Sequence, residues 1–411
     1  MKKCFLVSLT LCASLTCQAE GYYLKPVFSA NERYLSNLFM RQVPLQDNWI
    51  TTLSPGVNFG ILNENGDLNS NFTWNHLFYT NQSELDIDEQ LFNVAYQHKN
   101  IERLQWGFDG SYNNRSSLNT EGTVNGLVFT QVMSKQLSLA PSVSYNVDEL
   151  STLSLDYSYN KTTYEKNRNS FLANYDYHQV SSTFNHHYTE FDQMNVTLSS
   201  SRYNTQVQNL TTFNHVAQLG WQHSFSEQLV AYVSGGMNYS QAESTQQIPA
   251  HCVFDLSLVN SPCSPFRLEP ASEITTKKSG FGKVFRASIQ KSFERGSVSL
   301  IGSQNQTPTS QGLQTQQQLA INTTYTINER WSTGLSASYS SYEVTGQQNG
   351  SSNRTLYSIS PNIRWKLSPE INVGLSYSFG QQKFQGGNQP SQGNTVELQF
   401  SYQPQINHQV K

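Results

Sequence analysis

The sequence predicts an all-β fold: a transmembrane antiparallel β-barrel of about 18 strands, with short periplasmic turns and long extracellular loops. Three observations predict it. Apolar and small polar residues alternate with a period of two along the chain, as in strands with one apolar face and one polar face. The alternating segments run to about 10–15 residues, against about 5–6 in soluble sheets. The connections between them are alternately short and long, which is typical of bacterial outer-membrane barrels.

The composition agrees with a barrel that is apolar outside and polar inside. Of the 411 residues 36% are hydrophobic, 12% aromatic and only 13% charged, whereas soluble proteins carry about 25% charged residues. The mean hydropathy is −0.53, so the polarity lies in Asn, Gln, Ser and Thr. No later run of 18 apolar residues exists, which excludes transmembrane helices. A net charge of −3 gives no electrostatic reason to expect nucleic acid.

The first 19 residues have the features of a secretory signal peptide. Lys2 and Lys3 form a basic start, 4–15 is a short apolar stretch, and Cys17-Gln18-Ala19 places small residues at −3 and −1. The apolar stretch is too short to cross a bilayer. Acylation at Cys12 or Cys17, as in a lipoprotein, is the alternative, but the preceding Leu11 and Thr16 are larger than such a site prefers.

The strands follow from the alternation in chain order. The segment near the C-terminus, for example, carries Ile371, Val373, Leu375 and Tyr377 on one face and small polar residues on the other. The same reasoning predicts strands at 21–34, 49–63, 67–81, 88–100, 102–114, 130–147, 151–165, 171–188, 193–206, 212–226, 229–243, 279–293, 296–306, 315–328, 331–344, 353–367, 370–384 and 393–403.

Turn residues divide the connections into two classes. Short links such as Glu294-Arg295-Gly296 and Ser368-Pro369-Glu370 belong to one rim. Long polar connections belong to the other rim, and they are expected at 35–48, 115–125, 241–278, 305–314, 345–352 and 385–392.

The strand number is even, so both ends of the barrel fall on the short-turn side. Sixteen strands are the alternative, because 171–188 is irregular: its apolar parity slips between Tyr177 and Val180, as at a β-bulge. The expected organisation is a signal peptide at 1–19, an outer-membrane barrel at 20–403 and a periplasmic tail at 404–411.

Two cysteines remain after the signal peptide. Cys252 and Cys263 form an even pair in an exported chain, which predicts one disulfide closing a small loop. A metal site that includes His251 is the alternative, although no second cluster of ligands follows. The surrounding loop, 241–278, is expected either to fold inward and constrict the barrel or to stand outside as a stabilised external loop.

A catalytic site is not expected. The histidines near carboxylates are His178, His186, His187 and His223, but adjacent residues of a strand face opposite sides and no nucleophile elbow accompanies them. No metal or cofactor is expected either.

The lumen is the better candidate site. The alternation along each strand places neutral amides and hydroxyls on the inner face. It places no row of like charges there of the kind that selects ions. Isolated charges are expected among them at Lys25, Asp109, Asp156, Arg286, Arg364 and Lys366. Such a lumen suits an uncharged or weakly charged carbohydrate, although any water-filled interior must also be polar.

Short motifs spread over residues 20–411 resemble the outer-membrane porins associated with exopolysaccharide and exosortase systems, the beta-barrel porin 2 type. The resemblance rests on the opening YYLKPVFSANERYLSNLFM, on Ser54-Pro55-Gly56 within WITTLSPGVNFGI, and on LAPSVSYNV and ISPNIRWKL. Ser36 stands where that family usually has Asp. The resemblance implies a barrel of the Gram-negative outer membrane that serves surface polysaccharide secretion.

Three functions are therefore compared. The first is a porin for exopolysaccharide secretion by passive passage of carbohydrate, with 241–278 as constriction or gate. The others are a general small-solute diffusion porin and a closed structural or adhesive barrel. Expected partners are outer-membrane lipid, polysaccharide and periplasmic polysaccharide-export proteins. The sequence does not predict the oligomeric state.

Overall fold

The structure is a computed structural model of the 411-residue chain. It describes residues 21–63, 65–101, 103–124, 131–165, 172–206, 209–248, 251–254, 266–269, 271–310, 312–344, 353–387 and 389–404. The predicted signal peptide, Cys263, the 345–352 loop and the tail beyond 404 lie outside these residues.

Eighteen long strands form one sheet, and two short strands form a second. The long strands are β1 (Gly21–Leu35), β2 (Asn48–Asn63), β3 (Gly66–Tyr79), β4 (Ile87–Ile101), β5 (Leu104–Ser116), β6 (Met133–Asn146), β7 (Ser151–Tyr164), β8 (Tyr175–His187), β9 (Asp192–Thr205), β10 (Leu210–Ser226), β11 (Leu229–Ile248), β14 (Ser272–Phe293), β15 (Gly296–Thr309), β16 (Gly312–Thr326), β17 (Trp331–Val344), β18 (Arg354–Lys366), β19 (Ile371–Phe384) and β20 (Ser391–Tyr402). The short strands are β12 (His251–Phe254) and β13 (Phe266–Glu269), and the helical elements are η1 (Ser83–Leu85) and α1 (Ser117–Val124).

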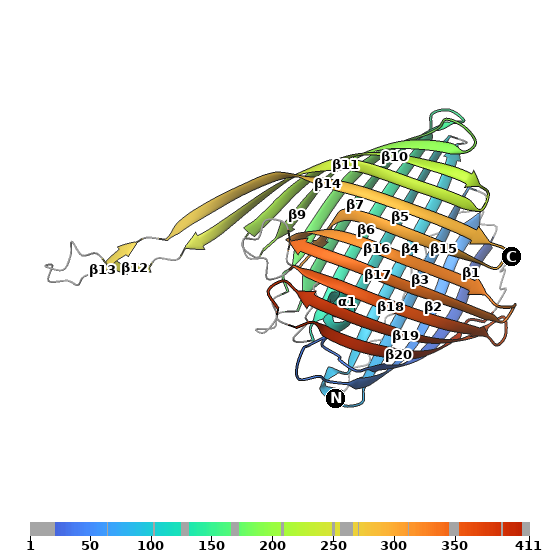
Figure 1. The fold of residues 1–411 in the computed structure, drawn as a ribbon, viewed down its shortest axis with the longest axis horizontal. Coiled ribbons are helices and arrows are strands. Elements are labelled where there is room, and N and C mark those ends of the chain that lie inside the picture. Colours follow the sequence, from blue (N-terminus) through green and yellow to red (C-terminus); the bar gives the residue numbers. More distant parts are fainter. Residues whose placement is uncertain are drawn as a thin grey trace, which may run out of the picture.

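The long strands form a closed antiparallel barrel, as predicted. Each pairs with its neighbour along the chain, and β1 closes the ring by pairing with β20 from Phe28↔Tyr402 to Leu35↔Thr395. The count is 18 rather than the alternative 16. Figure 1 shows the strands crossing the barrel at a common tilt. Closure leaves no sheet edge along the wall of a barrel, which is the condition for crossing a bilayer with strands.

The outer face of the wall is apolar. In β7, Leu153, Leu155 and Tyr157 are exposed on the outside, while Asp156 alternates with them on the inner face. Aromatic side chains gather near the strand ends; the rings of Trp331 and Trp365, for example, stack on adjacent strands with their centroids 5.3 Å apart. Such girdles mark the two membrane–water interfaces of a transmembrane barrel.

The irregularity predicted in 171–188 has a different cause from a bulge. The pairing of β8 with β7 and β9 runs without a register shift from Tyr175 to His186. Tyr177 is an aromatic residue at a position that faces the lumen, where polar residues are expected. It packs there, inside the barrel, against Tyr203 and Leu313. The apparent slip therefore marks an element docked on the inner wall.

The 305–314 connection is also shorter than predicted. β15 and β16 remain paired as far as Thr309↔Gly312, so a tight turn replaces the expected long loop. The backbone φ of Gly312 is 130°, a conformation that favours glycine at this turn.

The 241–278 segment continues the barrel wall outward. β11 and β14 pair for 20 residues up to Ile248↔Ser272, and β12 pairs with β13 beyond them. Figure 1 shows the outer ends of β11 and β14, with β12 and β13 beyond them, as an arm that leaves the barrel at the long-loop rim and extends well past it. Of the two expectations for 241–278, constriction of the lumen is wrong for the described residues and the external position is the one observed, because continuous pairing of β11 with β14 carries the hairpin away from the barrel axis.

Among the residues the structure describes, no helix has the length and apolar character needed to span a membrane.

Candidate functional site: the barrel lumen

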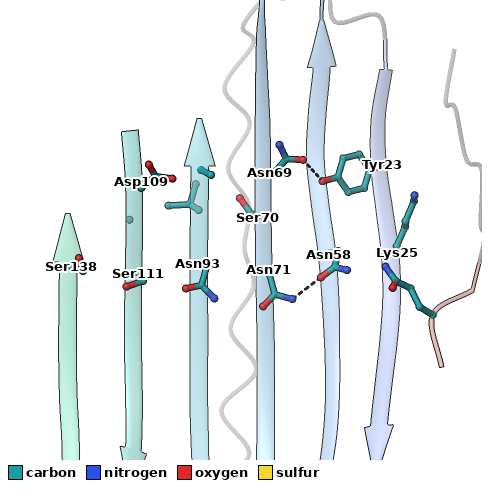
Figure 2. A pocket seen from close by; sticks show the side chains of 14 residues that line it. Tyr23, Lys25, Asn58, Asn69, Ser70, Asn71, Asn93, Asp109, Ser111 and Ser138 are labelled. Atoms are coloured by element: carbon teal, nitrogen blue, oxygen red, sulfur yellow. Dashed lines mark hydrogen bonds between the residues drawn. The ribbon is translucent and has the colours of Figure 1, made fainter. Parts of the chain in front are cut away.

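A cavity of about 520 Å³ lies on the inner wall of β1 to β6. Its lining includes two of the charges predicted for the lumen, Lys25 on β1 and Asp109 on β5, together with neutral polar side chains (Figure 2). The volume falls within the roughly 300–1,000 Å³ of small-molecule sites. Lys25 Nζ lies 5.4 Å from the centre of the Tyr23 ring.

A row of neutral hydrogen-bonding side chains crosses this wall from strand to strand. The register joins Lys25 to Asn58, Asn58 to Asn71, and Asn71 to Asn93. The row continues through Ser111, Ser138 and Asn160 on β5, β6 and β7. Neighbouring strands are about 4.8 Å apart, so the row presents a new amide or hydroxyl to the lumen at each such step.

Hydrogen bonds within the wall fix several of these groups. Asn71 Nδ2 donates to Asn58 Oδ1 at 2.6 Å, and Tyr23 Oη donates to Asn69 Oδ1 at 2.7 Å (Figure 2). Gly60 lies between Tyr23 and Asn69 in the register. A Cβ there would come within 2.8 Å of the tyrosine ring, so glycine lets the ring lie flat across the strand.

The other predicted lumen charges do not join this cavity. Asp156 lies on β7 between Ser142 and Ser181, and Arg286 lies on β14 between Ser234 and Ser303. Arg364 and Lys366 lie on β18, near the short-turn rim. All of them alternate with outward apolar residues, but only Lys25 and Asp109 are brought to a common cavity.

At the long-loop rim, helix α1 docks against the inner wall around one buried carboxylate. Glu89 on β4 is 1% exposed, and its Oε1 accepts hydrogen bonds from Ser116 N at 3.0 Å and Asn119 Nδ2 at 2.7 Å. Its Oε2 lies 3.6 Å from Arg115 Nε. Arg33 Nη2 donates to Asn119 Oδ1 at 3.2 Å, which ties the helix to β1 as well.

Sequence and packing both favour the helix at this place. The Ser116 hydroxyl accepts from Leu118 N at 3.3 Å, which is an N-cap contact. Leu118 packs against Ile50, Leu77 and Tyr79, a small apolar cluster that faces inward. The 115–125 connection, predicted as a loop, therefore contains an inward-docked helix.

The loop between β1 and β2 also folds inward. Asn37 donates to the carbonyl oxygens of Arg41 and Gln392 at 2.7 and 2.9 Å, and Gln382 Nε2 donates to Met40 O at 3.3 Å. Gly393 has room for Met40, because a Cβ at that position would lie 2.9 Å from Met40 Sδ. This loop therefore covers the inner face of β19 and β20.

The third inward element is the end of the β15–β16 hairpin. Tyr203 on β9 donates from Oη to Thr309 O at 2.8 Å, and Leu313 packs with Tyr177 and Tyr203. A second cavity, of about 250 Å³, lies between Pro308 of the hairpin and the wall of β5 to β8. Ser111 and Ser138 line both cavities, so a neutral polar path connects them.

Several lumen residues were not found by sequence reasoning. Parity could have identified Arg33, which shares the inward face of β1 with Lys25. Tyr203 and Tyr177 are aromatic residues at strand positions that face the lumen. Their presence there is the sequence signal that another segment packs on the inner wall. The contact of Tyr203 with Thr309 joins residues 106 positions apart and has no local signature.

The histidines considered for catalysis lie mainly on the outer face. His178 contacts Tyr157 Oη at 2.8 Å, His186 contacts Ser151 Oγ at 2.9 Å, and His223 contacts Asp192 at 2.7 Å. Each follows the outward parity of its strand, at a rim of the barrel.

For the cysteine pair, Cys252 lies on β12 opposite Leu268, while Cys263 lies outside the described residues. The predicted disulfide therefore stays a prediction. The described residues contain no group of three side chains suited to a metal ion.

Comparison with known proteins gives likenesses to solved structures alone. No family model and no curated protein matches the sequence. The open form of the ferric-catecholate import receptor Fiu from E. coli K12 is 8% identical with a TM-score of 0.48, covering 92% of this chain and 81% of that one. OccK2 (OpdF) of Pseudomonas aeruginosa in complex with glucuronate is 7% identical with a TM-score of 0.46, covering 92% and 98%. OccAB4 of Acinetobacter baumannii is 7% identical with a TM-score of 0.47, covering 94% and 99%.

The chain's own geometry decides its class. Eighteen strands close into a ring, their outer face is an apolar belt bounded by aromatic girdles, and their inner face is polar. A closed ring with a lipid-facing belt is the form in which strands cross the Gram-negative outer membrane. The chain is thus an outer-membrane β-barrel with a porin-like architecture.

Proposed function

We propose that this barrel is a porin through which polar, uncharged or weakly charged solutes, carbohydrates among them, diffuse passively. The observation that carries the proposal is the row of neutral groups from Asn58 through Asn93 to Ser138, which lines the first cavity and reaches the second at Ser111 and Ser138. When a sugar enters, its hydroxyls give up hydrogen bonds to water and form hydrogen bonds to these amides and hydroxyls. The net cost in free energy of this exchange is small. Passage therefore needs no energy source in the barrel itself.

Charge in the lumen supports a weakly ion-selective channel. Near the cavities the charges are scattered, with Lys25 and Asp109 on strands four positions apart in the ring. At the long-loop rim Glu89 lies beside Arg115, so opposite charges face each other at short range. Strong selectivity for one sign needs a row of like charges at a constriction, and neither place provides one.

Secretion of exopolysaccharide is the finer proposal. It rests on the sequence motifs that resemble exopolysaccharide-associated porins, and it adds periplasmic polysaccharide-export proteins as partners. A polymer whose hydroxyls exchange partners along the neutral row would use the same path as a small sugar. Deleting the gene should then abolish surface polysaccharide while leaving uptake of small sugars by other porins intact; unchanged surface polysaccharide would limit the function to diffusion.

The test of passive diffusion uses purified barrel in planar bilayers and in liposomes. We expect stable channels, a reversal potential near zero in a KCl gradient, and swelling of liposomes in maltose. The matched variant changes Asn58, Asn71 and Asn93 to Asp together, and it should shift the reversal potential toward cation selectivity without closing the channel. A folded wild-type barrel that neither conducts nor admits maltose would overturn the proposal in favour of a closed barrel.

A further inference from the structure

We infer that the tip of the β15–β16 hairpin, residues 308–310 and 312–313, is the size-selecting element of the pore. The inference rests on the proposed function, because it names the part of the lumen that limits which solutes pass. It assigns to a short hairpin turn a role that was one of the two alternatives for 241–278.

The first argument is the way in which β15 leaves the wall. β14 and β15 pair for nine residues only, and their ladder ends at Phe285↔Gln304. Beyond that pair β14 continues into the arm with β11, while β15 keeps only β16 as a partner. The last five residues of β15 are therefore free to bend inward. Gln306 then lies beside Ser240, on the inner face of β11, at 3.5 Å.

The second argument is where the bent hairpin ends. Tyr203, which is 0% exposed, donates its hydroxyl to Thr309 O, and Leu313 is 1% exposed against the rings of Tyr177 and Tyr203. Thr309 Oγ1 donates to Gly312 O at 2.9 Å and closes the turn. The hydrogen bond from Tyr203 and the packing of Leu313 on the two tyrosine rings thus hold the tip on β8 and β9.

The third argument is the span of the tip across the lumen. Eight successive pairings, from β5–β6 to β14–β15, separate β15 from β5 around the 18-stranded ring. Yet Pro308 and Ser111 of β5 line one cavity of about 250 Å³. The hairpin therefore reaches far across the lumen, and this cavity lies between its tip and the wall of β5 to β8.

The tip is thus a barrier in the lumen whose position depends on its contacts with Tyr203 and Tyr177. A solute that follows the neutral row passes between Pro308 and the wall that carries Ser138 and Asn160. The contacts that hold the barrier include the hydrogen bond from Tyr203 to Thr309 O and the packing of Leu313 on Tyr177 and Tyr203, so substitutions at Tyr203 and Leu313 should shift its position.

The experiment compares three variants with the wild type in planar bilayers. Tyr203→Phe keeps the ring and removes the hydroxyl, and with it the bond to Thr309 O. It should raise the frequency of brief larger openings about fivefold, which corresponds to the ~1 kcal/mol of one neutral hydrogen bond. Leu313→Ala undocks the tip, so the mean conductance and the largest polyethylene glycol that enters the pore should both rise.

Tyr377→Phe is the matched control. It removes a tyrosine hydroxyl that donates to Asn394 Oδ1 at the same 2.8 Å, but on the exposed outer face. It should behave as the wild type. Heat-modifiable mobility on gels verifies that each barrel is folded.

The outcomes separate the two proposals. Folded Tyr203→Phe and Leu313→Ala channels with wild-type conductance and polymer cut-off would refute the role of the tip and leave the porin function standing. Silence of the folded wild type and of every variant would refute the porin function, and the selecting role with it.

Discussion

Glu89 is the buried carboxylate around which α1 docks, which makes Glu89→Ala the most informative single substitution outside the hairpin tip. Glu89 accepts bonds from Ser116 N and Asn119 Nδ2 and faces Arg115. Each hydrogen bond to a charged group contributes about 1.5–3 kcal/mol. Losing the two short bonds therefore costs the docked helix about 3–6 kcal/mol by the same figures.

That free energy converts into a measurable opening of the helix. At 1.4 kcal/mol per tenfold change, amide exchange in α1 should become about 10²- to 10⁴-fold faster. Amides of β7 or β19, far from Glu89, should keep their rates. Hydrogen exchange followed by mass spectrometry on the barrel in detergent measures both regions in one sample.

Graded variants test the physical reasoning. Glu89→Gln keeps an oxygen that can accept from Ser116 N and Asn119 Nδ2 but removes the charge opposite Arg115. Its exchange rate should lie between those of the wild type and Glu89→Ala. Glu329→Gln, in an exposed turn at the opposite rim, serves as the control. If Glu89→Ala left the α1 amides as protected as in the wild type, the buried carboxylate would not be what holds the helix.

Two further predictions concern the arm and a periplasmic turn. Replacing 249–271 by a two-residue Asn-Gly turn joins Ile248 to Ser272, which are already paired. The single-channel conductance should stay unchanged. An increase in conductance would show that the arm obstructs the pore. In the turn after β6, hydrogen bonds from Leu150 N and the Ser151 hydroxyl lower the pKa of Asp148. The lowered pKa means that this contribution to stability is complete above the ordinary carboxyl pKa of about 4 and is lost as the pH falls below it. Urea unfolding between pH 3 and 7 should therefore show a smaller acid-side loss in Asp148→Ala than in the wild type, and equal losses would contradict this reasoning.

Much of the fold could be predicted because it depends on patterns among residues that are neighbours in the sequence. The two faces of each strand differ in polarity residue by residue, so alternation alone located the wall strands and decided which side chains meet lipid. Turn residues fixed the short-turn rim in the same local way. Strand length and low charge then selected a membrane over water as the surrounding medium, and the count of 18 followed.

Tertiary structure alone decided which segments obstruct the lumen. Length and cysteines left 241–278 either as a constricting loop or as an external one, and continuous pairing of β11 with β14 carries it outward. A short turn at Thr309 folds in instead, because the ladder with β14 stops at Gln304 and Tyr203 offers an anchor 106 residues away. The row from Lys25 to Ser138 likewise exists only through the register of six strands. Contacts between distant strands depend on closure of the ring, and no local pattern of residues encodes them.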